Sequence, residues 1–392
     1  MRYETQHVSV LISDLPTPSL LINRNQLEAN IALAQGRADR EDVVLRPHIK
    51  THKCPALARL QMEAGAKGLT VATLSEAEAF AAAGFDDIMI AKEMVDAISF
   101  GRIAKLTEQG VRISFCVDTV AGAAAASSFF SSKGMTADVL VEVDVGHGRC
   151  GIGWDDPKAV EFVRLVRRLS GLHIRGLLTH AGHGYRGPSE GETKGGALNR
   201  VMKEERDRLL SLAAQLGAAD LLDPADAILS IGSTPTFSRF ENAERDGFRI
   251  TETRPGNYVF HDAIQVALGV CSLKDCALTV RATVISIHRG SGTDRVYVNS
   301  GKKTLTTDKG YGLDEYGVIL HSPHTMNRMP HSRLVSLSEE HGWIKIPGGS
   351  PFDVGDRVYI VPNHACVAVA TQSTLYLVEG EEVVDEWSVA GR

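Results

Sequence analysis

Short runs rich in β-branched and other apolar residues alternate with Ala- and Leu-rich stretches of helical period through the first two thirds of the chain. The runs begin near Leu45, Leu69, Ile88, Ile113, Val139, Ile174, Ile228 and Phe248. Alternating strands and helices are typical of a parallel sheet, and eight parallel strands close into a barrel. The span from Ser19 to Tyr258 also has about the length of a (β/α)8 barrel, roughly 250 residues. The pattern therefore predicts an α/β fold of the TIM-barrel type.

Beyond His261 the pattern changes to alternating apolar and polar positions separated by Gly and Asp turns, as in LTVRATVISIH, RVYVNSG, WIKI, RVYIVPNHACVAVA and TLYLVEGEEVV. Such alternation predicts a mainly antiparallel β domain. We expect the barrel to comprise residues 15–260 and the β domain residues 261–392, joined by the N-terminal segment 1–14. A doubly wound sheet is the alternative for the first part, but the G-x-G-x-x-G fingerprint is missing from the first strand turn.

Local signals predict where some helices and loops lie. Ser75 and Glu78 have capping-box spacing, which predicts a helix over 75–83, and Asp118 or Thr119 begins a helix that ends near Ser131. The stretch 183–200, HGYRGPSEGETKGGALNR, is Gly-rich and predicts a long loop after the sixth strand. That loop is either a lid over a site or a surface loop without function.

Composition and charge exclude several classes of protein. Lys and Arg total 42 against 48 Asp and Glu, a formal net charge of -6, so no basic footprint for nucleic acid or an anionic membrane stands out. The chain has no apolar run of about 18 residues and no targeting segment at its N-terminus, so we expect a cytoplasmic protein. Six cysteines without a C-x-x-C pair predict reduced thiols rather than a disulfide framework.

Polar residues gather where the predicted strands end, which is where a parallel barrel carries its chemistry. They are Arg46, His48, Lys50, His52 and Lys53 after the first strand, Asp144, His147 and Arg149 after the fifth, Thr179, His180 and His183 after the sixth, Gly232-Ser233-Thr234 after the seventh, and Arg254-Pro255-Gly256-Asn257 after the eighth. The last two loops are the usual phosphate cradle of this architecture. GSTPT taken alone favours an ordinary helix N-cap turn, and its place in the seventh loop makes phosphate binding an equal alternative.

Lys50 is a candidate nucleophile. A lysine with a lowered pKa at a strand end can bind a carbonyl cofactor covalently, whereas a solvated lysine in a basic loop is the alternative. The combination of lysine, phosphate cradle and barrel indicates pyridoxal 5'-phosphate.

A second candidate site lies in Pro362-Asn363-His364-Ala365-Cys366. In an extended strand, residues two apart face the same side, so His364 and Cys366 would bind one metal ion from one edge. A core cysteine beside a surface histidine is the alternative. Two protein ligands would leave water or substrate to complete the coordination, as in a catalytic site.

Eight motifs, from about Asp14 to Cys366, resemble those of the D-serine dehydratase and D-threonine aldolase family of fold-type III pyridoxal-phosphate enzymes. They are LPTPSLLI, LRPHIKTHK, DVGHGRCGI, LLTHAGHGY, SIGSTPT, RPGNYVFHD, SEEHG and VPNHAC. RPHIKTHK and PNHAC together are the most specific. The resemblance implies an alanine-racemase-like barrel followed by a C-terminal β domain, in a homodimer whose active sites are completed by the partner chain.

The resemblance also implies a role for each matching residue. Lys50, and not Lys53, would hold the cofactor covalently, Arg149 would contact its phenolic oxygen, and His180 would pack against its ring. The phosphate would be held by Gly232, Ser233, Thr234, Gly256, Asn257 and Tyr258. His364 and Cys366 would bind the divalent metal ion. Zinc is the preferred ion because a thiolate is a soft ligand, and manganese and magnesium are the alternatives.

The resemblance favours dehydration of a small β-hydroxy D-amino acid to a 2-oxo acid and ammonia. His-x-Cys is the metal motif of the dehydratase branch, and LLTHAGHGY with GSTPT is most similar to bacterial dehydratases of 3-hydroxy-D-aspartate. Leu178 departs from the Tyr of many D-serine dehydratases, which leaves D-serine and 3-hydroxy-D-aspartate as alternative substrates. A D-threonine aldolase is the second candidate and a racemase the third. Glu340 and His341 of SEEHG lie either near the metal or in a surface turn.

Overall fold

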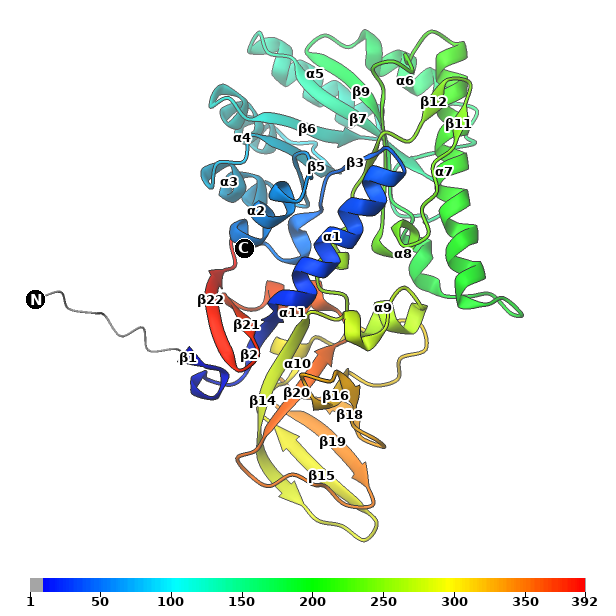
Figure 1. Cartoon of the computed structure of the whole chain (residues 1–392). Helices are drawn as coiled ribbons and strands as arrows, with labels where there is room; N and C mark the ends of the chain where they lie inside the picture. Colours follow the sequence, from blue (N-terminus) through cyan, green and yellow to red (C-terminus); the bar gives the residue numbers. More distant parts are fainter. Residues whose placement is uncertain (1–9, 392) are drawn as a thin grey trace, which may run out of the picture. The chain divides into compact units, whose positions relative to one another are not determined.

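The computed structural model describes residues 10–391, which form two compact units (Figure 1). The barrel unit comprises Ile31–Tyr258 and the C-terminal residues from Ala390. The β unit comprises the described residues up to Asn30 together with Val259–Val389. Residues 1–9 of the predicted N-terminal segment lie outside the described residues.

The barrel unit is built on eight parallel strands, which confirms the predicted α/β barrel class. In sheet order they are β3 (Val44–Leu45), β13 (Glu252–Thr253), β10 (Ile228–Ile231), β9 (Leu172–Thr179), β7 (Ala137–Asp144), β6 (Arg112–Val117), β5 (Asp87–Glu93) and β4 (Leu69–Val71). A parallel bridge between His48 and Thr70 joins the two ends of this order. Each strand overlaps one of the eight apolar runs that the sequence shows.

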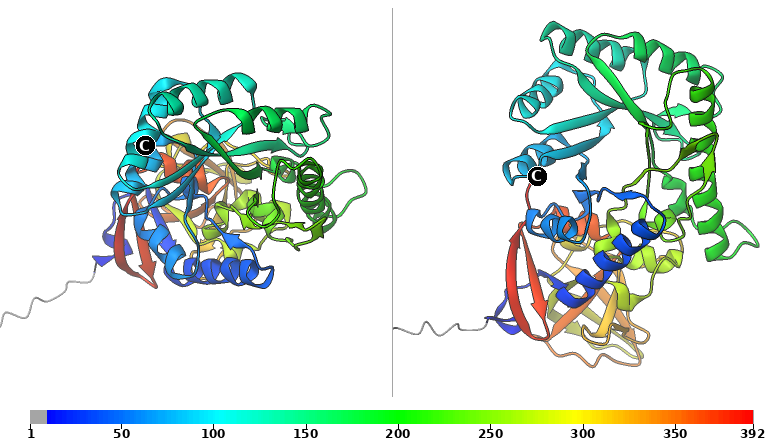
Figure 2. Two further views of the ribbon diagram at one scale, coloured as in Figure 1. Left: turned by 90° about the horizontal axis from the view of Figure 1, so that it is seen from above. Right: turned by 45° about the horizontal axis from the view of Figure 1, so that its top comes forward.

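Helices lie on the outside of the strands that they connect (Figures 1 and 2). They are α2 (Pro55–Glu63), α3 (Leu74–Ala82), α4 (Ala97–Glu108), α5 (Val120–Ser132), α6 (Ala159–Arg168), α7 (Lys194–Ala218) and α8 (Thr234–Phe237). Helix α1 (Arg24–Arg40) precedes β3. The apolar faces of these helices bury phenylalanines such as Phe80, Phe100 and Phe130 against the strands.

Three local predictions for the barrel unit need correction. The capping box of α3 uses Thr73 and Glu76 rather than Ser75 and Glu78; both pairs have the required spacing, but Glu76 also accepts hydrogen bonds from the backbone N–H of Ala72 and Thr73. The predicted loop 183–200 is helical from Lys194 onward, because Thr193 caps α7 by accepting from Gly196 N. The eighth barrel strand begins at Glu252; the earlier part of its run pairs as β12 (Phe248–Arg249) with β11 (Glu244–Arg245).

The β unit is a large, mainly antiparallel sheet, as predicted. Its strands are β1 (Val10–Leu11), β2 (Ser19–Asn23), β14 (Leu278–His288), β15 (Thr293–Val298), β16 (Gly317–Ser322), β17 (Asn327–Arg328), β18 (Arg333–Leu337), β19 (Gly342–Pro347), β20 (Arg357–Pro362), β21 (Thr374–Glu379) and β22 (Glu382–Ser388). The long strand β14 pairs with β2, β15 and β20. Because β2 also pairs with β21, residues 15–30 belong to the β unit rather than to the barrel that the sequence predicts.

Short helices α9 (Ala263–Leu268), α10 (Lys302–Leu305) and α11 (Ala365–Ala370) complete the β unit. Helix α11 contradicts the predicted extended strand through His364 and Cys366: β20 ends at Pro362, and His364 is the N-cap of α11. Glu340 and His341 lie in the exposed turn between β18 and β19, where Ser338 N donates to His341 O. Within residues 10–391, no helix is both long and apolar enough to cross a membrane.

Candidate active site

A pocket of about 420 Å³ opens among the carboxyl ends of the barrel strands. It is lined by His48, Lys50, Ala72, Thr73, Ala91, Lys92, Glu93, Arg149, Cys150, Leu178, His180, Gly232 and Arg254. Its volume lies within the range of ordinary small-molecule sites, about 300–1,000 Å³. Four of the residues that the sequence predicts, Lys50, Arg149, His180 and Gly232, are therefore together in one pocket.

Lys50 lies in the short 3-10 helix η2 (Ile49–Thr51), which follows β3 after a short connection. The segment before it is fixed because His48 N donates to Pro255 O and Thr70 N donates to Pro47 O. Lys53 points elsewhere: its Nζ lies 3.0 Å from Glu76 Oε1 and donates to Gly391 O. Of these two lysines, Lys50 is the one that lines the pocket.

His180 follows β9 and its ring is held from the next loop. Its Nδ1 lies 3.0 Å from Gly232 O, so Nδ1 carries the proton of a neutral ring and donates it to that carbonyl. Burial, together with the charge of Lys50, lowers the pKa of His180 to about 3. The imidazole is therefore neutral at physiological pH and presents a flat, uncharged ring to the pocket.

Glu205, from α7, joins the sixth and seventh loops. Its buried Oε1 accepts hydrogen bonds from Ala181 N at 3.1 Å and Gly232 N at 3.0 Å. Burial raises the pKa of this carboxyl group. A residue of the outer helix thus fixes the backbone on which His180 and Gly232 are carried, a function that the helical pattern of α7 does not reveal.

The loop that carries Arg149 is folded around Asp144, the last residue of β7. Asp144 Oδ1 accepts hydrogen bonds from the backbone N–H of Gly146, His147 and Gly148 at 2.9–3.1 Å. Although burial raises the pKa of Asp144, these donors lower it overall. The carboxylate therefore stays charged and sets the turn that brings Arg149 to the pocket.

The two loops predicted to hold phosphate pack directly on neighbouring backbone. A Cβ on Gly232 would lie 2.6 Å from Arg254 N, and one on Gly256 would lie 2.7 Å from His48 O. Thr234 Oγ1 accepts a hydrogen bond from Tyr258 N, which ties the seventh loop to the eighth.

Ser233 and Tyr258 have structural partners inside the barrel unit. Ser233 caps α8 by accepting from Thr236 N, and the Tyr258 hydroxyl accepts from Gln61 Nε2 at 2.9 Å. The predicted residues Ser233, Thr234, Asn257 and Tyr258 are buried. Together with Gly256 they lie in or beside the two loops without lining the pocket itself.

Several pocket residues were given no function from the sequence. Arg254 is 4% exposed and donates to Ser230 Oγ and Thr179 O. Glu93, at the end of β5, and Cys150, in the loop after β7, also line the pocket. His48, Arg254 and Glu93 all come at the ends of apolar runs, so strand-end position is a signal that could have found each of them.

In the β unit, His364 and Cys366 lie at the start of α11. His364 Nδ1 is 2.6 Å from Asp308 Oδ2, which leaves Nε2 as the ligand atom. Burial lowers the pKa of His364, but the Cys366 side chain, in hydrogen-bond contact, and Asp262 and Asp308 raise it to about 10. The turn at the helix start, rather than an extended strand, therefore brings the imidazole and the sulfur together.

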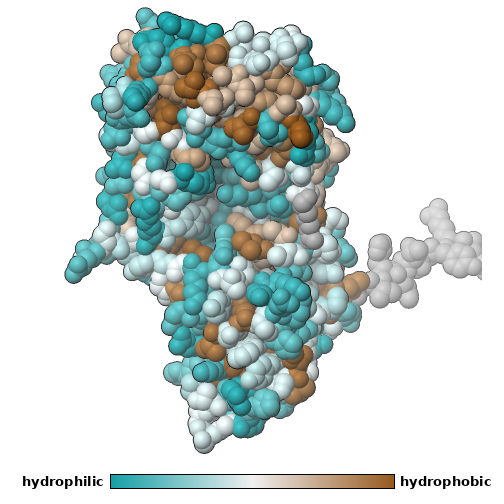
Figure 3. Space-filling view, turned by 180° about the vertical axis from the view of Figure 1, so that it is seen from behind, coloured by the Kyte–Doolittle hydropathy of each residue, from teal (hydrophilic) through white to brown (hydrophobic). Residues whose placement is uncertain are grey.

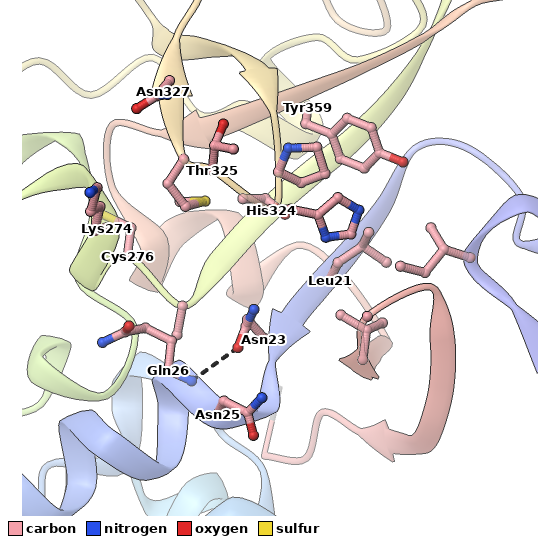
Figure 4. Close-up of a pocket in the computed structure, with 17 residues that line it drawn as sticks. Leu21, Asn23, Asn25, Gln26, Lys274, Cys276, His324, Thr325, Asn327 and Tyr359 are labelled. Carbon is pink, nitrogen blue, oxygen red and sulfur yellow. Dashed lines mark hydrogen bonds between the residues drawn. The ribbon is translucent and has the colours of Figure 1, made fainter.

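A different pocket, of about 610 Å³, lies in the β unit (Figure 4). Figure 4 shows Asn23, Asn25 and Gln26 on one side of it and His324 and Tyr359 on another; Gln26 N donates to Asn23 Oδ1 at 3.0 Å. None of the residues predicted from the sequence lines it. Size alone therefore does not identify the chemical site, and the smaller barrel pocket is the better candidate.

Both predicted groups fit the residues present. The wall of the barrel pocket combines lysine, arginine and neutral histidine side chains with Gly232, as pyridoxal phosphate requires. His48 Nδ1 is buried there with no hydrogen-bond partner among the described residues. An imidazole oriented by a carboxylate beside a thiol is a donor set typical of zinc.

Comparison with known proteins adds independent evidence. The model of the alanine racemase N-terminal domain matches residues 22–263, and that of a serine dehydratase domain matches residues 277–378. D-threo-3-hydroxyaspartate dehydratase of Delftia sp. (strain HT23) is 34% identical, covering 95% of this chain and 97% of its own. D-threonine aldolase of Arthrobacter sp. is 32% identical, covering 97% of this chain and 94% of its own. A solved structure of D-threo-3-hydroxyaspartate dehydratase, a cysteine-to-alanine variant in the metal-free form, has a TM-score of 0.86 at 34% identity and covers 97% of this chain and 98% of its own.

Proposed function

Because the chain belongs to the D-serine dehydratase and D-threonine aldolase family, with its alanine-racemase-like barrel, we propose that it is a pyridoxal-phosphate- and divalent-metal-dependent lyase. It would dehydrate and deaminate a β-hydroxy D-amino acid of the D-serine or 3-hydroxy-D-aspartate type, giving a 2-oxo acid and ammonia. The observation that carries the proposal is the pocket wall that combines Lys50, Arg149, His180 and Gly232.

Lys50 would hold the cofactor covalently until the amino group of the substrate displaces it, and the freed amine of Lys50 would then accept the proton from the substrate Cα. Bound pyridoxal phosphate would supply an electron sink for the negative charge that remains on Cα. Arg149 would contact the phenolic oxygen and the neutral His180 would pack against the ring. The phosphate would be bound by Gly232, Ser233, Thr234, Gly256, Asn257 and Tyr258. The Gly232 N–H donates to Glu205 and the Tyr258 N–H donates to Thr234 Oγ1, so the other polar groups of these loops would contact the phosphate.

His364 and Cys366 would hold the metal, with Asp308 orienting the imidazole through its Nδ1–H. A divalent ion bound there would stabilise the negative charge on the departing β-hydroxyl, since hydroxide is a poor leaving group. The thiol favours zinc over manganese or magnesium, because a thiolate is a soft ligand. The solved metal-free cysteine variant of the related dehydratase is consistent with a cysteine acting as metal ligand.

The aldolase is the second candidate, because D-threonine aldolase is 32% identical to this chain over nearly its whole length. It would use the same lysine but break the Cα–Cβ bond, giving glycine and an aldehyde. The dehydratase is preferred because His-Ala-Cys matches the metal motif of the dehydratase branch.

The decisive experiment is a panel of D- and L-β-hydroxy amino acids incubated with enzyme loaded with pyridoxal phosphate and zinc. Ammonia and 2-oxo acid released from D-serine or 3-hydroxy-D-aspartate would support the dehydratase. Glycine and aldehyde released from D-threonine without ammonia would support the aldolase. Neither product from any D-amino acid would refute the lyase.

We also propose that the enzyme is a cytoplasmic homodimer. Val95, Ile98 and Val120, which are 58%, 80% and 50% exposed, lie at or near the starts of α4 and α5 and offer an apolar surface to a second copy. Hydrophobic side chains also gather at the upper end of the face shown in Figure 3. Light scattering would show twice the chain mass of 42.3 kDa, and Ile98→Glu should reduce it to that of one chain.

A further inference from the structure

Three side chains outside the proposed mechanism form a cluster at the wall of the barrel pocket. Glu93 ends β5, Glu142 lies in β7, and Cys150 follows Arg149. One carboxylate oxygen of each glutamate and the cysteine Sγ lie within 4.8 Å of one another. Glu93 and Cys150 also line the pocket.

Glu142 is the buried member that contacts Arg149. Its side chain is 3% exposed, whereas that of Arg149 is 49% exposed. Glu142 Oε1 accepts from Arg149 Nη2 at 3.3 Å and from Cys150 Sγ at 3.2 Å. The carboxylate therefore lies behind the guanidinium and holds it from the interior of the barrel.

The cluster needs one more positive charge than Arg149 supplies. Glu142 Oε2 and Glu93 Oε1 are both buried without a hydrogen-bond partner among the described residues. The Glu142 carboxylate is buried and that of Glu93 is half-buried, so the two cannot both ionise beside a single guanidinium without a large energetic cost. Either a proton or a metal ion must be shared between them.

The surroundings favour the proton. Burial, followed by the charge of Glu93, raises the pKa of Glu142. Burial also raises the pKa of Cys150 to about 12, so its thiol keeps the proton that a metal ligand would have to lose. The other groups that face the pair are Arg149, the buried Cys116 thiol of β6, whose pKa is raised, and Arg254. A metal ion would lie next to the Arg149 guanidinium.

We propose that Glu142 and Glu93 share one proton and that Glu142 is the positioning residue that holds Arg149 against the pocket. This inference rests on the proposed function, because Arg149 is the residue assigned to the cofactor. The two glutamates have unequal tasks: Glu142 accepts the hydrogen bond from Arg149 through Oε1, and Glu93 is the neighbouring carboxylate with which Glu142 shares the proton.

The test measures the dissociation constant of pyridoxal phosphate, and its pH dependence, by visible absorption. Glu142→Gln removes the carboxylate behind Arg149, and with it the shared proton, and we expect cofactor affinity to fall about tenfold or more. Glu93→Gln leaves the charge of Glu142 in place, since its amide can donate to Glu142 as the shared proton does. We expect this variant to bind pyridoxal phosphate with a dissociation constant within about twofold of that of the wild type. A plot of the dissociation constant against pH should, however, lose the inflection that the shared proton contributes above the ordinary pKa of a glutamate.

A double-mutant cycle separates positioning from a general effect on folding. If Glu142 acts through Arg149, Glu142→Gln should have no further effect in an Arg149→Gln background. Glu78→Gln is the matched control, because Glu78 pairs with Arg102 on the same unit at 2.7 Å but lies outside the pocket. The proposal would be overturned if Glu142→Gln and Arg149→Gln had additive effects on the free energy of cofactor binding. It would also be overturned if Glu93→Gln kept the inflection in the pH dependence of the dissociation constant.

The metal alternative is tested with Co²⁺ alone on the His364→Ala/Cys366→Ala protein. We expect no binding at the cluster; one Co²⁺ per chain that is lost on Glu142→Gln would overturn the shared proton. Failure of this inference is distinguishable from failure of the proposed function. If the wild type binds no pyridoxal phosphate, the proposed function fails; if it does and Glu142→Gln behaves like Glu78→Gln, only this inference fails.

Discussion

Replacing Gly232 by alanine tests whether the seventh loop must approach the eighth as closely as the structure shows. Gly232 has a φ of +146°, a conformation that L side chains rarely adopt. A Cβ there would lie 2.6 Å from Arg254 N and 3.1 Å from Arg254 C, both backbone atoms that cannot rotate away. The substitution should therefore disturb the loop and its neighbour together.

The expected loss of stability has two parts. The unfavourable φ costs about 1–2 kcal/mol, and forcing extra volume into a packed site costs about 1–3 kcal/mol. Together they predict a loss of about 2–5 kcal/mol in the free energy of unfolding of the barrel unit. Gly134→Ala is the matched control: Gly134 has a φ of +66° but nothing within 4 Å of its Cβ position, so only the backbone strain applies.

The assay is urea unfolding of both variants, followed by titration with pyridoxal phosphate. Gly232→Ala should unfold at clearly lower urea than Gly134→Ala and bind the cofactor at least tenfold more weakly, because the substitution displaces the loop that is proposed to hold the phosphate. Gly134→Ala should bind as the wild type does. Equal unfolding and equal cofactor affinity in the two variants would refute the close approach of the two loops.

Lys50→Ala should abolish the visible absorption of lysine-bound cofactor. Lys53→Ala should retain it, because the Nζ of Lys53 pairs with Glu76. The reverse result would show that Lys53, and not Lys50, binds the cofactor. Asp308→Asn should weaken zinc binding about 10- to 100-fold, measured by competition with a chelator, without changing cofactor absorption. Burial lowers the pKa of His52 and of His180 to about 3 from 6.5. The unfolded chain therefore binds protons that the folded chain does not, and stability should fall as pH drops from about 6.5 towards 3, by about 1.4 kcal/mol per pH unit for each histidine. In urea titrations His52→Gln should remove one histidine's share of that slope, and an unchanged slope would contradict the assignment.

The barrel was predictable because strands buried on both faces leave apolar runs, and all eight runs contain a strand. Exact element ends were less predictable. Two capping boxes, Thr73 with Glu76 and Ser75 with Glu78, overlap in the same stretch, and only the structure shows that Glu76 accepts from Ala72 N. Helix α11 was missed because Ala-Cys-Val-Ala-Val-Ala is apolar and partly β-branched, so its sequence favours a strand equally.

The candidate site was predictable where polar residues interrupt the ends of apolar runs. Lys50, Arg149, His180 and Gly232 are such residues, and one pocket contains them all. Strand-end position does not reveal which polar residues face the pocket: Lys53 lies three residues after Lys50 and pairs with Glu76 instead. The roles of these residues toward a cofactor come from family resemblance and remain predictions.

The residues that hold the site together were harder to find, and for a common physical reason. Glu142 lies inside a strand and Glu205 inside a helix, and both are almost completely buried. Each uses one carboxylate oxygen to hold groups carried by the pocket loops, Glu142 on the Arg149 guanidinium and Glu205 on the backbone of Ala181 and Gly232. A buried carboxylate costs stability unless it is paired. The buried carboxylates of Glu142 and Glu205 therefore stabilise the pocket loops. Substitution of either residue should change cofactor affinity although neither side chain contacts the cofactor.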